Sequence, residues 1–461
     1  MTPEQWLDLL VAKLNARRPY IDAMRGYTRR GAPLPEMSKN TRAAWLAFQR
    51  KARANWGGLA VEARADRIVL SGVTVAGAVD TPEAQAAARI IRDNRLEVAF
   101  ADAIEDCLAV GYGYLVVGTG VDGRAVVTAE QPEYVIVAQD ELQPWRSVAA
   151  LKLWRHPFDG LDYALLWIPG YRVKFSRKSP SSAFSANPVS ASGGGWVEVE
   201  RHEFDGPVPV YELEGKPGDT SLASVRFSGG LSIIDEHVDL IDRINLGVLQ
   251  RLVTTAIQAF KQRAVKGDLP EVDAAGNKID WAAVFEPSPG ALWELPEGID
   301  IWESATTDIR PMLDAVKDDL RAFGALTGAN LTGVTSDAAN QSAEGVRDGR
   351  DKAASGAART LARVTPVLNG AMLAALRIEG FEDPGTIAVK FEDPRRVTLA
   401  EKTDAASKMI AAGASLPIVQ RDILGWSPDT IAEDERNRQR VAGRATLDAL
   451  RSAANAVPSG V

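Results

Sequence analysis

The chain is poor in the residues that crosslink a fold or carry it through a lipid bilayer. Cys107 is its single cysteine among 461 residues. One thiol cannot form an intramolecular disulfide, so we expect assembly in a reducing compartment. Cys107 lies in a helical pattern, and we interpret it as a small buried hydrophobe. No window approaches about 18 uncharged apolar residues, which predicts that no segment spans a membrane.

Motifs of catalysis and cofactor binding are also missing. The sequence contains neither the G-x-x-x-x-G-K-[ST] phosphate loop nor a G-x-S-x-G nucleophile elbow. It has three histidines, His156, His202 and His237, and His237 is followed at i+3 and i+4 by leucine and isoleucine rather than by metal ligands. We therefore predict a protein that is not an enzyme and that holds no cofactor and no metal.

The charge balance limits the kind of nucleic-acid contact that the chain can make. Its formal net charge is −8 and its pI is about 5.3. Proteins that coat nucleic acid gain affinity by neutralising phosphates with Lys and Arg, so this composition argues against such a protein. It remains compatible with a protein that touches DNA without holding it.

The order of the predicted elements is informative. Helices in the N-terminal part, including a longer one over 82–110, lead into alternating strand patterns typical of an antiparallel β-meander. Residues 231–266 then read as one helix of about 36 residues, roughly 50 Å long. A compact segment rich in proline and tryptophan follows at 267–304, and a second helix at 307–326. After a polar stretch, a helix over 342–377 contains Gly345, Gly349, Gly356 and Pro366, which predicts a bend.

Aspartates recur at helical spacing on the two helices that flank the proline-rich segment. Asp235, Asp239 and Asp242 fall at i, i+4 and i+7 on the first, and Asp314 and Asp318 repeat the spacing on the second. One interpretation is a solvated face near a helix N-terminus, where acidic residues are favourable. The other is an acidic wall that repels a passing polyanion.

Several short motifs, in this order, carry a family resemblance. They include "LTGANLTG", "SAEGVRDGRDK", "VKFEDPRRVTLAEKTDAASK" and the early "NWGGLAVEARADRIVLSGV". Together with the order of the elements, they make the chain resemble the portal proteins of tailed bacteriophages, in particular the branch common in phages of actinobacteria. The proline usual after Thr327-Gly328 in that family is absent.

The resemblance implies an α+β portal fold with a mixed α/β wing, a two-helix stem, a small α/β clip insertion, a long kinked helix and a helical crown. The implied layout is a wing of N-terminal helices and β-meander at 1–230, stem helix 1 at 231–266, clip at 267–304, stem helix 2 at 305–327, tunnel loop at 328–342, kinked wing helix and return strand at 343–395, and crown at 396–461.

The resemblance also implies a function and partners. The protein would form a ring, usually of twelve subunits, at one capsid vertex, as the channel for double-stranded DNA packaging and ejection. Its partners would be its own copies, non-specific double-stranded DNA, the terminase large subunit, a head-completion or adaptor protein, and the major capsid and scaffolding proteins, with no membrane. It would be assembled in the host cytoplasm and located in the virion.

The predicted site residues follow from that layout. The DNA-facing tunnel-loop candidates are small polar residues and two arginines: Asn330, Thr332, Thr335, Ser336, Asn340, Gln341, Arg347 and Arg350. The arginines are equally suited to salt bridges with Glu344 or Asp351. The acidic channel wall is Asp235, Asp239, Asp242, Asp314 and Asp318. The candidates for partner docking at the clip are Trp281, Phe285, Trp293 and Trp302, whose aromatic side chains would equally suit an internal mini-core.

Two other functions compete with this one. A different head–tail connector or minor capsid protein would not need the long helix–insertion–helix hairpin. An α+β hydrolase with a carboxylate pair would need a catalytic constellation, which the sequence does not offer.

Overall fold

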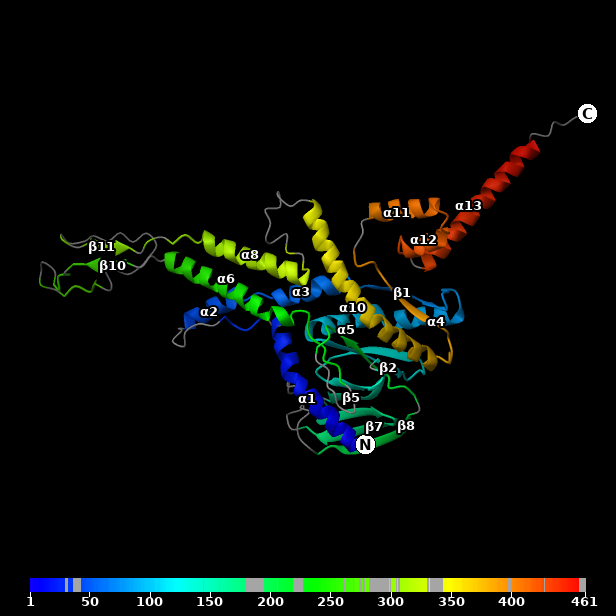
Figure 1. Cartoon of the computed structure of the whole chain (residues 1–461), viewed down its shortest axis with the longest axis horizontal. Coiled ribbons are helices and arrows are strands. Elements are labelled where there is room, and N and C mark those ends of the chain that lie inside the picture. The colour runs from blue at the N-terminus through cyan, green and yellow to red at the C-terminus, as the bar shows by residue number, and fades with distance from the viewer. Residues whose placement is uncertain are drawn as a thin grey trace, which may run out of the picture.

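A computed structural model describes residues 1–29, 32–35, 43–143, 145–156, 158–179, 195–204, 206–218, 227–259, 263–267, 269–272, 276, 278–281, 298, 300–303, 305, 307–329, 331, 343–395, 399–426 and 428–455. The fold is mixed α+β, as the sequence predicts. A layered α/β body carries two projections, a helical hairpin and a C-terminal helix (Figure 1).

The centre of the body is a three-stranded sheet with helices on one face. Its strand order is β3-β2-β9, formed by β2 (Tyr112–Thr119), β3 (Ala125–Glu130) and β9 (Val210–Glu214). The helices α5 (Leu96–Val110) and α10 (Ala343–Ile378) pack on it. Leu115, Val117 and Leu213 alternate with residues of the opposite face and join this main core, which also buries Phe100 and Leu368.

The second sheet is a five-stranded antiparallel meander. Its order is β4-β5-β6-β7-β8, formed by β4 (Val135–Gln139), β5 (Ser147–Arg155), β6 (Leu161–Ile168), β7 (Gly170–Lys178) and β8 (Val197–Phe204). The predicted meander is thus confirmed for these strands. The prediction fails for β9, which returns to pair with β2, because alternation of side chains does not specify the partner of a strand.

The helix α1 (Pro3–Thr28) joins the two sheets into one body. Its first half packs Leu10 and Leu14 on the outer face of the five-stranded sheet, whereas Ile21 and Met24 in its second half enter the main core. On the inner face, Tyr114 of β2 packs against residues of β4 to β6. Thr2 and Gln5 form a capping box at the helix start.

The remaining elements surround this body. They are α2 (Ala43–Ala52), α3 (Trp56–Ala65), α4 (Pro82–Asp93), and the paired strands β1 (Leu70–Val75) and β12 (Ile387–Phe391). A single helix over 82–110 was expected from the sequence, but α4 and α5 are separate. Asn94 ends α4 and binds β3, donating to the Ala125 carbonyl at 3.1 Å and accepting from the Val127 amide at 3.0 Å. Arg95 follows in the left-handed conformation, with φ 49°.

The first projection is a hairpin of α6 (Val238–Ala259) and α8 (Arg310–Thr327), which lie side by side and extend away from the body (Figure 1). The predicted single helix over 231–266 is therefore wrong at both ends. Leu231 pairs with Lys216, and the turn η1 (Asp235–His237) precedes α6. At the other end, β10 (Arg263–Lys266) pairs with β11 (Asp300–Glu303) at the hairpin tip.

The helix α10 crosses the body and continues through Pro366. Residues Asp351–Ile378 are long and apolar enough to span a membrane by length and composition alone. Within this segment Val364, Leu368 and Leu376 are buried in the main core, so we interpret α10 as a core helix. The predicted bend at Pro366 stays a prediction.

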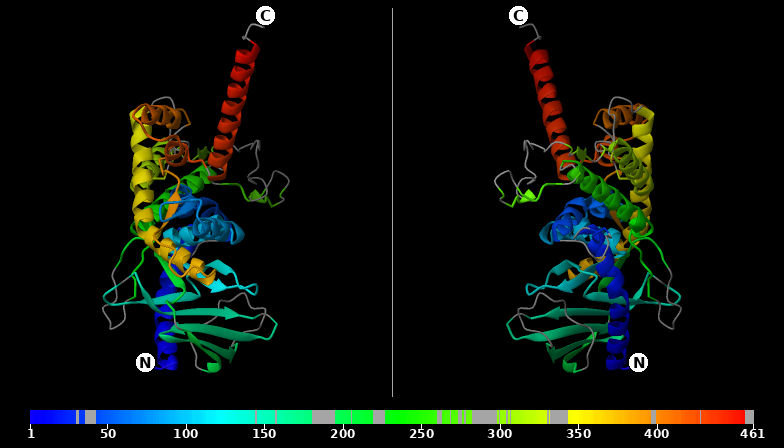
Figure 2. Two further views of the ribbon diagram at one scale, coloured as in Figure 1. Left: turned by 90° about the vertical axis from the view of Figure 1, so that its right-hand side faces the viewer. Right: turned by 90° about the vertical axis from the view of Figure 1, so that its left-hand side faces the viewer.

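The C-terminal region contains α11 (Leu399–Ala411), α12 (Leu416–Asp422) and α13 (Pro428–Asn455). The last of these extends away from the body in every view (Figures 1 and 2). It is the second projection.

Candidate functional site

The hairpin is held together by close packing and one strong ion pair. Gly247 of α6 faces Val316 of α8 so closely that a Cβ on it would lie 2.8 Å from the valine side chain. Arg243 binds Asp319 across the hairpin through two hydrogen bonds of 2.7 and 3.0 Å. This fork geometry fixes the two helices in register.

The five aspartates of the predicted acidic wall are not equivalent. Asp239 is exposed, and Asp314 and Asp318 have side chains that are 71% and 70% exposed. Asp314 lies 3.9 Å from Lys317, and Asp318 binds Arg321 at 2.7 Å on the same helix. Such exposed pairs contribute little stability. These three aspartates, which we call the exposed acids, are available to a ligand.

The other two aspartates contact α1. Asp242 accepts a 2.8 Å hydrogen bond from the Tyr27 hydroxyl, and burial together with the neighbouring Asp235 carboxylate raises the pKa of Tyr20. Burial, together with the Asp242 carboxylate, raises the pKa of Tyr27, so the phenol stays a donor. Asp242 thus attaches the base of the hairpin to the body, a role that helical spacing alone did not indicate.

The predicted tunnel loop begins at a firmly anchored base. Gly328 ends α8 in the left-handed conformation, with φ 78°, and donates to the Gly324 carbonyl at 2.9 Å. A Cβ on Gly328 would lie 3.3 Å from the Ala353 backbone of α10. Arg64 donates to the Thr327 carbonyl at 3.1 Å, and Leu331 is buried. The N-terminal end of the loop is therefore fixed against the body.

Most of the loop candidates lie outside the described residues: Asn330, Thr332, Thr335, Ser336, Asn340 and Gln341. Arg347 and Arg350 lie in the first turns of α10, and their side chains are likewise outside the described part. Their predicted contact with DNA stays a prediction.

The predicted clip candidates divide in the same way. Trp281 donates from its indole nitrogen to the Pro270 carbonyl at 2.8 Å and so serves a local contact. Trp302 of β11 is 57% exposed. Phe285 and Trp293 lie outside the described residues. Trp302 is the candidate whose aromatic surface the structure leaves accessible.

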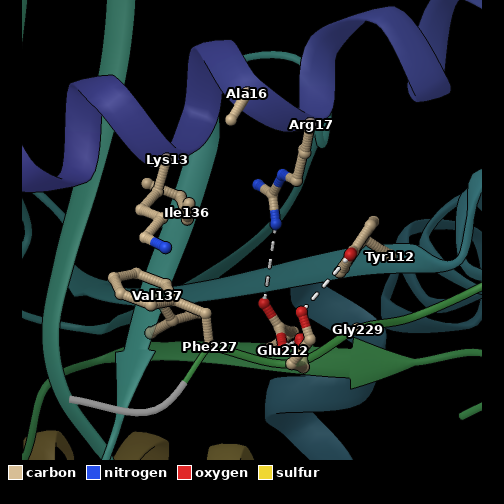
Figure 3. Close-up of a pocket in the computed structure, with 10 residues that line it drawn as sticks. Lys13, Ala16, Arg17, Tyr112, Ile136, Val137, Glu212, Phe227 and Gly229 are labelled. Carbon is tan, nitrogen blue, oxygen red and sulfur yellow. Dashed lines mark hydrogen bonds and ion pairs between the residues drawn. The ribbon is translucent and has the colours of Figure 1, made fainter. Parts of the chain in front are cut away.

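A buried polar cluster, which motif searches missed, connects the sheets with α1 beside a pocket of about 240 Å³ (Figure 3). Glu212 of β9 accepts hydrogen bonds from Tyr114 and Ser228, and its carboxylate lies 4.0 Å from the Arg17 guanidinium. Burial raises the pKa of Glu212. Tyr114 is about 100 residues from both Arg17 and Glu212 along the chain, so no spacing in the sequence relates these three residues.

Other titratable groups give no sign of a reactive site. Cys107 is buried, as predicted, and burial raises the pKa of its thiol, which keeps it unreactive. Among the described residues, no group of three or more His, Cys, Asp or Glu side chains is placed to hold a metal ion.

Comparison with known proteins identifies the family. The sequence model described as "Phage portal protein, SPP1 Gp6-like" matches residues 15–428. The chain belongs to this family of phage portal proteins. A portal protein is a structural, non-enzymatic component of the virion, so the predictions on enzymatic activity and on location in the virion are confirmed.

Solved structures similar to this portal protein come from gene transfer agent (GTA) particles. A chain in the neck of the native GTA particle, computed with C12 symmetry, is 15% identical, with a TM-score of 0.44 and coverage of 88% of this chain and 98% of that one. A chain in the virion of the native particle is 16% identical, with a TM-score of 0.41 and coverage of 89% and 99%. No curated protein matches the chain.

Proposed function

We propose that this portal protein forms a ring of twelve subunits at one capsid vertex and conducts double-stranded DNA during packaging and ejection. The observation that carries the proposal is the α6–α8 hairpin, a projection with exposed acids along α8 and a small sheet at its tip. Head-to-tail contacts between copies close into a ring when the rotation between them allows it.

The proposed layout assigns each projection a place in that ring. Residues 1–230 and 343–395 form the wing, α6 and α8 the stem, residues 267–304 the clip, residues 328–342 the tunnel loop and residues 396–461 the crown. The strands β10 and β11 flank the clip and support it as a unit at the hairpin tip. The narrower resemblance to portals of actinobacteriophages belongs to this proposal as well.

In this proposal the exposed acids line the channel. Repulsion between Asp239, Asp314 and Asp318 and the phosphate backbone keeps DNA from adsorbing while it passes. The tunnel loop contributes small polar side chains for weak contacts independent of sequence. Its N-terminal end is anchored at Gly328, which packs against Ala353 of α10.

The clip is the proposed docking site for the terminase large subunit and, after packaging, for a head-completion or adaptor protein. An exposed tryptophan is a frequent anchor of binding energy at interfaces, and Trp302 meets that description. The wing would contact the major capsid and scaffolding proteins. Because the chain belongs to the portal family, the alternative assignment as a minor capsid protein has no support.

Imaging of the purified full-length protein tests the ring. Negative-stain microscopy should show a turbine-shaped particle with a central hole, and light scattering should give the mass of about twelve chains. A compact monomer at every protein and salt concentration would overturn the proposal.

The acidic lining needs a functional assay. Asp239→Lys, Asp314→Lys and Asp318→Lys should leave ring assembly intact and lower the number of DNA-filled heads when they replace the protein in its phage. Asp→Asn variants at the same positions control for charge reversal and should have a smaller effect. Normal packaging by all three lysine variants would refute the lining.

A further inference from the structure

The C-terminal helix α13 presents an unusual charge distribution on an isolated projection. Its first turns are held at α12, where Gln420 donates to the Asp434 carboxylate at 2.6 Å. Beyond them the helix extends from the body (Figure 2), and residues 435–447 are exposed throughout. Side chains on this part of the helix face solvent rather than a core.

Four arginines follow a run of acidic residues on the helix. Glu433, Asp434 and Glu435 lie near the body, arginines follow at 436, 438, 440 and 444, and Asp448 and Arg451 come after them. Arg438 is neutralised by Asp434, at 2.7 Å. The other three form no ion pair among the described residues: Arg436 donates to the Ala432 carbonyl, Arg440 donates to the Asn437 side chain, and Arg444 is exposed.

These three arginines share one face. Arg436, Arg440 and Arg444 are spaced by four residues, which places them in a row about 12 Å long. Like charges at this spacing destabilise a helix by a few tenths of a kcal/mol per pair. The helix macrodipole does not account for the row, because its effect is limited to the last turn and α13 continues to Asn455.

We infer that this arginine row is a contact surface for the phosphate backbone of double-stranded DNA. The inference rests on the proposed function, in which DNA passes through the ring. A 12 Å length of duplex carries about seven phosphate charges, so the row has a complementary partner along its whole length. The chain has a net charge of −8, and the exposed acids of the hairpin repel DNA. The arginine row therefore places the electrostatic attraction for DNA on α13.

The composition of α13 favours DNA over an acidic protein as the partner. The helix contains no aromatic residue to act as an anchor. Among the described side chains of α13, the exposed large aliphatic ones are Val441 and Leu447, which are six residues apart and so fall on different faces. Because the arginines contact phosphates rather than base edges, binding is independent of sequence.

Salt-dependent binding of a short fluorescent duplex to the full-length protein tests the row. Each lost phosphate contact lowers the slope of log K against log salt by about 0.9. The triple variant R436Q/R440Q/R444Q should therefore lower it by about 2.7 for one contacting subunit. Replacement of the same three arginines by lysine should keep the slope, since lysine also binds phosphate as a point charge.

The chain offers a matched pair of single variants. Arg440→Gln and Arg438→Gln remove the same charge from neighbouring turns, but Arg438 is already neutralised by Asp434. Arg440→Gln should lower the slope by about 0.9 and Arg438→Gln by much less. Equal slopes for these two variants, or a wild-type slope for the triple glutamine variant, would overturn the inference.

Two further readouts separate the possible failures. Negative-stain imaging of each variant shows whether the ring has assembled. If the triple glutamine variant forms a ring and still binds DNA with the wild-type slope, this inference is rejected and the proposed function stands. If the wild-type protein forms no ring, the proposed function is rejected instead.

Polyglutamate serves as a protein-like polyanion in a second control. If the triple glutamine variant no longer binds polyglutamate but still binds the duplex, the arginine row binds an acidic protein and our inference is rejected.

Discussion

The body and the two projections use charged residues in opposite ways. In the body, Arg25 binds Asp106 at 2.6 Å and Glu133 at 2.7 Å, and the three side chains are between 7% and 14% exposed. On the hairpin, Asp314 and Asp318 are about 70% exposed and pair within their own helix. Buried charges therefore fasten α1 to the rest of the body, whereas on the projections several charges, such as those of Asp314 and Asp318, remain exposed to a ligand.

The largest effect should come from breaking the buried network. Arg25→Ala leaves the buried Glu133 without its bound cation and Asp106 with Arg29 alone, and breaking a buried ion pair typically costs about 3–5 kcal/mol of unfolding free energy. Urea denaturation of the purified protein, followed by circular dichroism, measures the loss. Arg321→Ala, which removes an exposed pair of the hairpin, should cost less than about 1 kcal/mol. Equal losses would show that the contrast between body and projection is wrong.

The second effect lies at the boundary between the two regions. Asp242→Ala removes the acceptor of the Tyr27 hydroxyl, and a hydrogen bond to a charged group contributes about 1.5–3 kcal/mol. Asp239→Ala, one turn away and exposed, should change stability by less than about 0.5 kcal/mol. The comparison of their denaturation midpoints separates an anchoring aspartate from a channel-lining one.

A smaller effect is expected at the base of the tunnel loop. Gly328→Ala places a Cβ in the left-handed conformation, which costs about 1–2 kcal/mol, and moves it against Ala353. Gly443→Ala in the exposed part of α13 meets no neighbour and should instead gain up to about 1 kcal/mol of helix stability. Thermal melts of the two variants should shift in opposite directions, and shifts of the same sign would contradict the proposed geometry of the loop base.

The sequence predicted long uninterrupted helices better than the places where elements end. Periodicity located α8 and α10 within a few residues, because each forms one long amphipathic pattern. It joined α4 to α5, because only the contacts of Asn94 with β3 reveal the break. It also extended α6 over β10, since the four residues of that strand are defined by pairing with β11 and not by composition.

The same limit applies to the candidate site. Spacing grouped Asp235, Asp239 and Asp242, but the role of the last depends on a tyrosine more than 200 residues away in the chain. The cluster around Glu212 depends likewise on residues brought together by the fold. Helical spacing finds the residues that share a face, whereas tertiary packing decides which of them remain free to act.

The smallest effect distinguishes two buried carboxylates within the body. Burial alone would raise the pKa of Glu133, but the Arg25 guanidinium outweighs it and holds the pKa below its usual value of 4.5. Burial also dominates at Glu212, where Arg17 compensates less and the pKa is raised above 4.5. Glu133 therefore stabilises the fold above its unfolded pKa and loses that contribution as the pH falls through its folded pKa.

Glu212 has the opposite sign, because its contribution is complete below its unfolded pKa and is lost as the pH rises through its raised folded pKa. Unfolding free energies measured across pH 3 to 8 check both signs. Glu133→Gln should flatten the acid limb below about pH 4.5, and Glu212→Gln should flatten the decline above it. If both variants altered the same limb of the stability–pH curve, the direction of the pKa shift assigned to Glu133 or to Glu212 would be wrong. The contrast between these two buried carboxylates would then not hold.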